Sequence, residues 1–108
     1  MTYQVVFAPE AEDQLAQLYR YIADHSSADV AARYTESIVT YCEGLRVFPH
    51  RGNQRDDIRP GLRLSSYRKR VTIAFAVETG RVVILGVFYA GRDYSAAMRA
   101  VEDEAESS

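Results

Sequence analysis

The sequence predicts an α+β domain in which a hairpin of two helices packs on one face of a small antiparallel sheet. After a strand-like segment at the N-terminus, apolar residues recur at intervals of three and four along two stretches, the period of amphipathic helices. Three segments of strand character then follow one another, as in an antiparallel sheet. A chain of 108 residues suffices for one core, so residues 1–108 are expected to form a single domain.

The N-terminal segment, residues 3–8, has the composition of a strand, and a helix is predicted from Pro9 through Ala23. Proline is tolerated in the first turn of a helix, and the acidic residues that follow it suit the positive end of the helix dipole. His25 is expected to cap the end of this helix, where a cation is favoured. The apolar stripe of the helix contains Ala11, Leu15, Leu18, Tyr19 and Ile22.

A second helix is predicted after the break at residues 25–27, with Ser27 or Asp29 as its N-cap. Its stripe is expected to end at Phe48, directly before Pro49. Because few residues connect the two helices, they should form an antiparallel hairpin. The stripe contains Ala31, Tyr34, Ile38, Tyr41, Leu45 and Phe48.

The second half of the chain is predicted to form the sheet. Residues 49–61 are rich in turn-forming residues and indicate a loop. Strands are expected over residues 61–67, 71–77 and 81–89, the last two joined by a hairpin turn at Gly80. The last strand is apolar on both faces, so we expect helices over one face and a partner over the other. A short C-terminal helix is predicted from Tyr94 onward.

Composition excludes several classes of protein. Hydrophobic residues make up 47% and charged residues 26% of the chain, which excludes wholesale disorder. No apolar run is long enough to cross a membrane, and the N-terminus lacks the features of a secretory signal, so a cytoplasmic protein is expected. The single cysteine, Cys42, is expected to be a small core residue. With only His25 and His50 besides, neither a metal site nor another cofactor is expected.

Positive charge is concentrated in residues 46–70, which carry a net charge of +6 in a protein whose total is −2. Seven of the eight cations in this segment are arginines, whose planar fork pairs with carboxylates and phosphates. The segment therefore indicates a contact surface for an acidic protein or a nucleic acid, with its arginines on one shared face. A solvated loop and strand edge is the alternative interpretation.

The sequence contains no Gly-rich phosphate loop, nucleophile elbow or paired-histidine metal motif. One constellation fits metal-free cleavage of a phosphodiester, in which cations stabilise the transition state and Lys69, Tyr94 or His50 transfers protons. Its members are Arg63, Arg68, Lys69, Arg70, Arg92 and Tyr94.

The order and spacing of several motifs resemble the ParE branch of the RelE/ParE superfamily, the toxins of type II toxin–antitoxin modules. The resemblance covers residues 2–95. The motifs are residues 3–7 with Pro9-Glu10-Ala11 and Leu15, then Leu45, Phe48-Pro49, Gly52 and Gly61-Leu62-Arg63, then the strands 71–77 and 83–89 with Gly91-Arg92-Asp93.

The resemblance implies a RelE/ParE-like fold and a toxin that inhibits DNA gyrase by binding it, with no catalytic residues. It also implies a ParD-like antitoxin whose acidic and apolar C-terminal segment wraps around the toxin in a hetero-oligomer, and no membrane partner. The residues expected to contact the antitoxin or the target are Arg51, Arg55, Arg59, Arg63, Tyr67, Arg68, Arg70, Tyr89 and Arg92.

The alternative within the superfamily is a RelE-like, ribosome-dependent mRNA endonuclease. Its set of Lys, Arg and C-terminal Tyr is matched loosely by Lys69, Arg70, Arg92 and Tyr94. The chain has only one lysine, which favours the ParE interpretation. Ala90 stands where family members often carry a basic residue or histidine before the Gly-Arg pair, so the target stays open. A non-toxic binding module is a third hypothesis.

Overall fold

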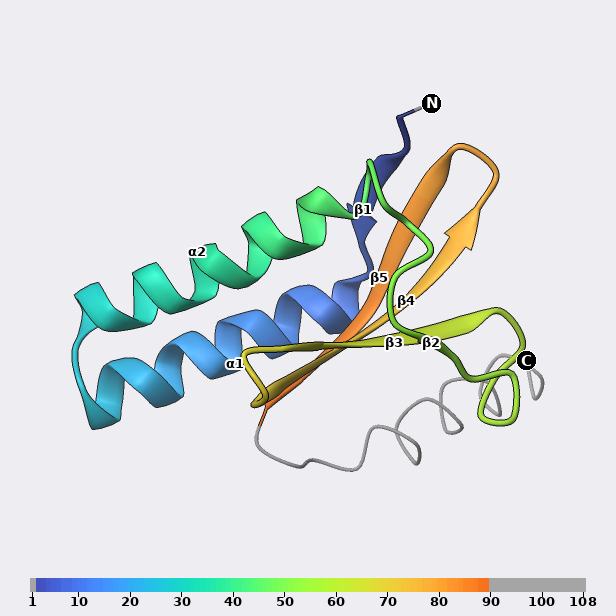
Figure 1. Cartoon of the computed structure of the whole chain (residues 1–108). Coiled ribbons are helices and arrows are strands. Elements are labelled where there is room, and N and C mark those ends of the chain that lie inside the picture. Colours follow the sequence, from blue (N-terminus) through green and yellow to red (C-terminus); the bar gives the residue numbers. More distant parts are fainter. Residues whose placement is uncertain (1, 90–108) are drawn as a thin grey trace.

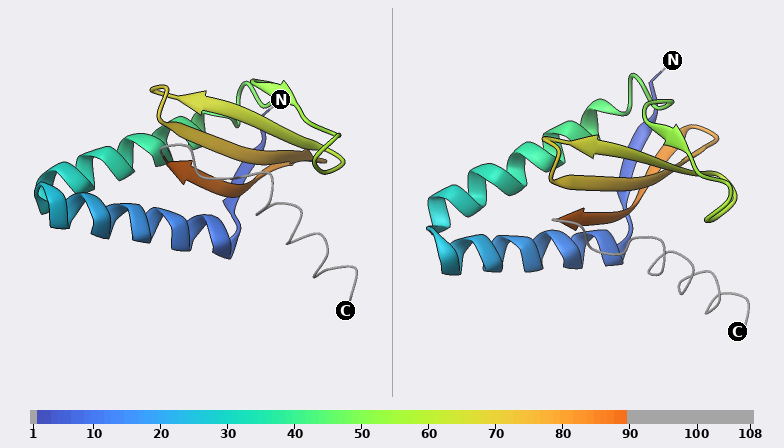
Figure 2. Two further views of the ribbon diagram at one scale, coloured as in Figure 1. Left: turned by 90° about the horizontal axis from the view of Figure 1, so that it is seen from below. Right: turned by 60° about the horizontal axis from the view of Figure 1, so that its bottom comes forward.

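The computed structural model describes residues 2–89, which form two helices and a five-stranded sheet (Figure 1). The helices form the predicted hairpin and lie on one side of the sheet, as the two views in Figure 2 show. The α+β prediction is confirmed, whereas the predicted C-terminal helix falls outside the described residues. In chain order the elements are β1 (Gln4–Phe7), α1 (Pro9–His25), α2 (Ala28–Gly44), β2 (Asn53–Gln54), β3 (Leu62–Tyr67), β4 (Val71–Glu78) and β5 (Arg81–Tyr89).

Local capping fixes the connection between the two helices. α1 continues two residues beyond the predicted Ala23, and the Nδ1 atom of His25 lies 2.8 Å from the backbone oxygen of Tyr21, which accepts a hydrogen bond from it. The Ser27 hydroxyl oxygen accepts a hydrogen bond of 3.1 Å from the Val30 amide. Ser27 is therefore the N-cap of α2, one of the two predicted candidates.

α2 ends at Gly44, so the prediction that it reaches Phe48 is wrong. Three-residue turns follow the helix, in which the amides of Arg46 and Val47 donate to the carbonyls of Glu43 and Gly44. Phe48 is 62% exposed and does not join the core. Pro49 accounts for the non-helical backbone of Phe48, because a proline disfavours helical backbone at the residue before it, and Gly44 is a poor helix former at the point where α2 ends.

The sheet is mixed rather than antiparallel throughout. Its strand order is β1-β5-β4-β3-β2, and β1 pairs parallel to β5. The three strands predicted to be antiparallel do pair in that way, with Gly80 at positive φ in the β4–β5 turn. Residues 49–61, predicted to be a loop, contain the two-residue strand β2 on the outer edge of β3. A strand this short leaves no alternation in the sequence that could reveal it.

A β-bulge determines which face of the sheet each residue of β5 reaches. Ala74 pairs with Gly86 and Phe75 with Ile84, so Leu85 is an extra residue on β5. Before the bulge Val82 and Ile84 belong to the core beneath the helices, and after it Val87 belongs to the same core. The side-chain alternation has thus shifted by one residue, and Phe88 and Leu85 fall on the opposite face.

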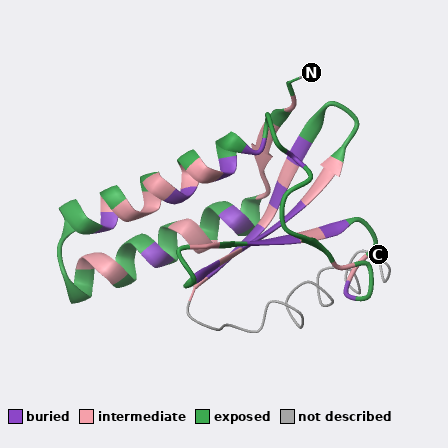
Figure 3. Cartoon of the chain, in the orientation of Figure 1, coloured by how far each residue is buried: buried purple, intermediate pink, exposed green. Residues whose placement is uncertain are grey.

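Both faces of the sheet carry a buried cluster. Figure 3 marks the buried residues in purple. The larger cluster lies between sheet and helices. The smaller one, on the other face, contains Ile58 from the loop before β3, so the chain itself covers part of the face that was expected to await a partner. Among residues 2–89 no helix is long and apolar enough to cross a membrane. The smaller cluster consists of Ile58, Leu62, Leu64, Ala74 and Phe88.

Candidate binding surface

Arg68 and Lys69 form the tip of the β3–β4 hairpin in an unusual backbone conformation. Their φ angles are 52° and 62°, and the Arg70 amide donates a 3.3 Å hydrogen bond to the Tyr67 carbonyl. Two successive residues in the left-handed region suit a tight hairpin, but glycine or asparagine normally occupies them. Figure 3 shows this turn as exposed. The sheet therefore holds three exposed cations of the basic segment, Arg68, Lys69 and Arg70, at this turn.

The guanidinium groups of two predicted contact arginines lie over aromatic rings. The guanidinium carbon of Arg68 lies 5.3 Å from the ring centre of Tyr67, and that of Arg51 lies 5.8 Å from Tyr41 and 5.7 Å from Phe48. Tyr41 and Tyr67 are themselves neighbours, with ring centres 4.9 Å apart. We call these five residues the arginine–tyrosine surface. Stacked guanidinium groups keep their charge and their hydrogen-bonding edges available to a partner.

Arg63 holds the loop of this surface in place through hydrogen bonds to its backbone. Its Nε atom donates to the Arg51 carbonyl at 3.0 Å and its Nη2 atom donates to the His50 carbonyl at 2.8 Å. The guanidinium group thereby ties β3 to the loop that carries Arg51. Arg63 was predicted to be a contact residue. In the structure it orients the loop that carries another predicted contact residue, Arg51.

Arg55 and Arg59 lie elsewhere, in the loop that precedes β3. Arg55 pairs with Asp57 through two hydrogen bonds of 2.9 and 3.0 Å. This loop and the Arg68–Lys69 turn lie at opposite ends of β3 (Figure 2), which spans roughly 20 Å at about 3.3 Å per residue. The expectation that the arginines share one face is therefore wrong for this pair.

Tyr67 and Tyr89, both predicted contacts, are half-buried and pack against the core beneath the helices. The ring of Tyr34 meets that of Tyr89 edge-on at 6.2 Å. Burial raises the pKa of Tyr34, Tyr89 adds to the rise, and the positive charges of Arg68 and Arg70 oppose it. Both arginines therefore lie close enough to act on the Tyr34 hydroxyl. Arg92 and Tyr94 lie outside the described residues.

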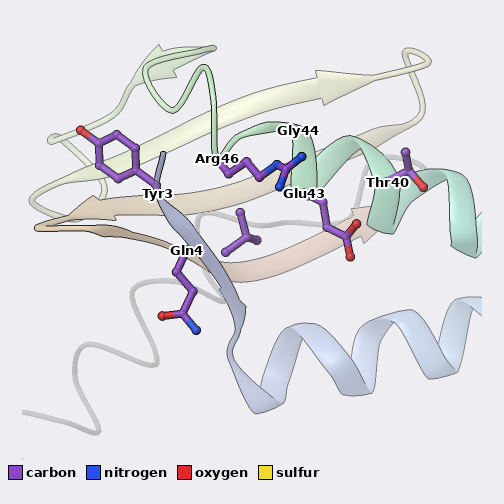
Figure 4. A pocket seen from close by; sticks show the side chains of 7 residues that line it. Tyr3, Gln4, Thr40, Glu43, Gly44 and Arg46 are labelled. Atoms are coloured by element: carbon purple, nitrogen blue, oxygen red, sulfur yellow. The ribbon is translucent and has the colours of Figure 1, made fainter. Parts of the chain in front are cut away.

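A separate hollow lies between β1 and the C-terminal end of α2 (Figure 4). Glu43 and Arg46 give it one negative and one positive charge, and none of the predicted contact residues lines it. Among the residues that the structure describes, no group of three or more metal-ligating side chains occurs. The hollow is therefore separate from the predicted contact residues. Its lining consists of Tyr3, Gln4, Val5, Thr40, Glu43, Gly44 and Arg46.

Sequence reasoning missed two members of the surface, Tyr41 and Phe48, because it assigned both to the core stripe of the second helix. Tyr41 does pack partly against the core, but its ring also faces Arg51 and its hydroxyl is hydrogen-bonded to the Ser65 hydroxyl. The available signal was Pro49, which marks Phe48 as non-helical and so removes it from the stripe.

Cys42 is expected to be unreactive in the folded protein. Burial raises the pKa of its thiol to about 12, so almost no thiolate forms at neutral pH. Iodoacetamide at pH 8 should leave the native thiol unmodified and should label the chain fully in denaturant. Because the folded pKa lies above the usual value of 9.0, the thiol's contribution to stability is complete below pH 9 and is lost as the pH rises toward 12. Rapid labelling of the native protein would contradict this burial.

The Lys69→Gly substitution is expected to stabilise the fold by about 1 kcal/mol, because glycine adopts positive φ without the steric cost that a Cβ atom brings. Urea unfolding measures the effect. Lys69→Ala is the matched control, since it removes the same charge and keeps the strain. Equal stabilities of the two variants would show that the turn is unstrained.

Comparison with known proteins places this geometry in context. No curated protein matches the sequence. Among solved structures, a chain from the chromosomal ParDE toxin–antitoxin system of P. aeruginosa is similar in fold, with a TM-score of 0.73 at 16% sequence identity over 83% of this chain and 98% of that chain. The sequence also matches, over residues 5–94, the family described as the ParE toxin of the type II toxin–antitoxin system parDE. Because that match spans most of the chain, the protein belongs to the ParE toxin family of type II toxin–antitoxin systems.

Proposed function

We propose that the protein inhibits DNA gyrase by binding it and that a ParD-like antitoxin neutralises it. The observation that carries the proposal is the exposed arginine–tyrosine surface on a chain of the ParE family. Arginines stacked on aromatic rings are typical of protein interfaces, where both residue types contribute strongly to affinity. Binding through such a surface requires no catalytic group.

The charge of this surface favours an acidic partner segment. Arg51, Arg68, Lys69 and Arg70 lie along one end of the sheet and the adjoining loop, and all four are exposed. Carboxylates of an antitoxin would pair with the guanidinium forks, while its apolar residues would pack on the exposed ring of Phe48. Toxin and antitoxin would then form a hetero-oligomer in the cytoplasm, where the gyrase target resides.

Expression of the chain from a tightly repressed promoter tests the proposal. We expect growth arrest on induction and inhibition of gyrase supercoiling of relaxed plasmid by the purified protein. The double variant Arg68→Gln/Arg70→Gln should weaken inhibition, whereas Arg46→Gln, which removes one charge in the separate hollow, should not. Normal supercoiling at every protein concentration would exclude gyrase as the target.

The RelE-like alternative rests on Lys69 and Arg70, which lie together at the exposed hairpin turn where an RNA phosphate could be reached. Translation-coupled cleavage of mRNA in a cell-free system tests it. Cleavage that is lost in Arg92→Ala and in Tyr94→Phe would support the nuclease, and intact mRNA would exclude it.

A further inference from the structure

The Tyr34 hydroxyl is buried and has no hydrogen-bond partner among the described residues. This is unusual, because a buried hydroxyl without a partner costs free energy and nearly all such groups are satisfied. The neighbouring Tyr41 on the same helix behaves normally, since its hydroxyl is bonded to that of Ser65. Tyr34 therefore holds a hydrogen-bond donor that no residue of the described range 2–89 uses.

Sheet register places this hydroxyl beside a row of side chains at the end of the sheet. Tyr89 pairs with Val71, and Val71 pairs with Tyr67, so the three lie side by side across β5, β4 and β3. All three pack against the core on the helix side, where the Tyr34 ring meets Tyr89. Arg68 directly follows this row and Arg70 directly precedes Val71. Both cations thus lie at the turn beside this row, and their charge acts on the Tyr34 hydroxyl.

The chemistry of the group suits an anion. A tyrosine hydroxyl offers one donated hydrogen bond, and bonds from O–H to a carboxylate oxygen are short and strong. Burial and Tyr89 keep the pKa of Tyr34 raised, so the group remains a protonated donor at neutral pH in spite of the two arginines. The arginines supply the positive charge that a desolvated anion needs.

We propose that Tyr34, Arg68 and Arg70 form a subsite for one carboxylate side chain of the antitoxin's acidic segment. The assignment rests on the proposed function in naming the antitoxin as the source of the carboxylate. A flat carboxylate on a flexible side chain is narrow enough to reach a buried hydroxyl, whereas the phosphodiester of a nucleic-acid backbone is joined to sugars on both sides. Because the Tyr34 hydroxyl is buried, side chains around it must move for the carboxylate to reach it.

The test uses a hexaglutamate peptide as the probe and follows its binding by NMR titration of the full chain. Tyr34→Phe is expected to weaken binding about tenfold or more, the effect of losing one hydrogen bond to a charged group. The same variant should melt at the same or a higher temperature, because it removes only an unsatisfied group. Tyr19→Phe is the matched control: Tyr19 is an exposed tyrosine of α1 outside the arginine–tyrosine surface, so loss of its hydroxyl should change neither the affinity nor the melting temperature.

Charge controls complete the experiment. Arg68→Gln/Arg70→Gln should abolish hexaglutamate binding, and Arg46→Gln should leave it unchanged. A lower melting temperature of Tyr34→Phe with unaltered affinity would overturn the proposal, since the hydroxyl would then have a structural partner such as an ordered water. Tighter, Tyr34-dependent binding of single-stranded dT12 would overturn it in favour of a nucleic-acid site. Peptide binding without growth arrest would retain the subsite and reject the toxin function.

Discussion

Replacing Gly52 by alanine is expected to lower the free energy of unfolding by about 3 kcal/mol or more. Gly52 has a φ angle of 73°, where an L-residue loses roughly 1–2 kcal/mol. A Cβ atom at this position would also overlap the backbone carbonyl of Leu64, next to which the chain runs before it pairs with β3 as β2. Overlap with backbone cannot be relieved by a rotamer change, and crowding of this kind adds about 1–3 kcal/mol.

Alanine substitutions at Gly61 and Gly80 separate the cost of positive φ from the cost of overlap with the backbone. The two glycines have φ angles of 80° and 76°, but a Cβ atom on either would meet nothing within 4 Å. Gly61→Ala and Gly80→Ala should therefore cost only the conformational part, about 1–2 kcal/mol. Urea unfolding of the three variants measures the difference. If all three lost the same stability, the close approach of Gly52 to β3 would be wrong, and with it the placement of the Arg51 loop.

The contact of Gly52 with β3 illustrates why the fold was easier to predict from sequence than the site. The two helices and the strands β3 to β5 produce periodic apolar patterns over many residues, so their type could be predicted from sequence. β2 has two residues and depends on the contact between Gly52 and Leu64, which are far apart in sequence. Parallel pairing of β1 with β5 likewise depends on tertiary contacts that no local pattern encodes.

The charge pattern identified the segment that carries the arginines but not its geometry. Residues 46–70 do provide the arginines of the arginine–tyrosine surface, yet β3 runs through the middle of the segment and separates its ends. Linear charge density therefore could not distinguish Arg68, which is exposed at the turn, from Arg55, which pairs with Asp57. The aromatic partners were harder still to predict, because Tyr34 and Tyr41 belong to the same apolar stripe of α2 as residues of the core.

Gln14→Leu is the second substitution expected to have a large effect, a loss of about 2 kcal/mol. The Gln14 Oε1 atom on α1 accepts a 2.7 Å hydrogen bond from the Val87 amide, at the β-bulge of β5. Leucine would leave that amide without its acceptor, and an unsatisfied buried donor costs about 1–3 kcal/mol. Gly86 belongs to the same arrangement, because a Cβ atom there would lie 3.3 Å from Gln14 Oε1 and closer still to the Phe88 ring.

Gln17→Leu is the matched control, since Gln17 is an exposed residue of the same helix. It should change stability by no more than about 0.5 kcal/mol. Amide hydrogen exchange provides a local measurement: in Gln14→Leu the Val87 amide should exchange roughly tenfold faster or more, while amides in β3 follow global stability only. Unchanged exchange at Val87 would mean that the bulge does not need Gln14.

The consequence of this contact reaches the binding surface. The bulge shifts the alternation of β5 by one residue, and this shift is what directs Tyr89 toward the helices, where it meets Tyr34. A helix residue 73 positions away in sequence from Val87 therefore helps to position the tyrosine that flanks the proposed carboxylate subsite. Gln14→Leu should accordingly weaken hexaglutamate binding even though Gln14 does not belong to the subsite, and Gln17→Leu should not. Equal affinities of the two variants would show that Tyr89 keeps its place without the bulge contact.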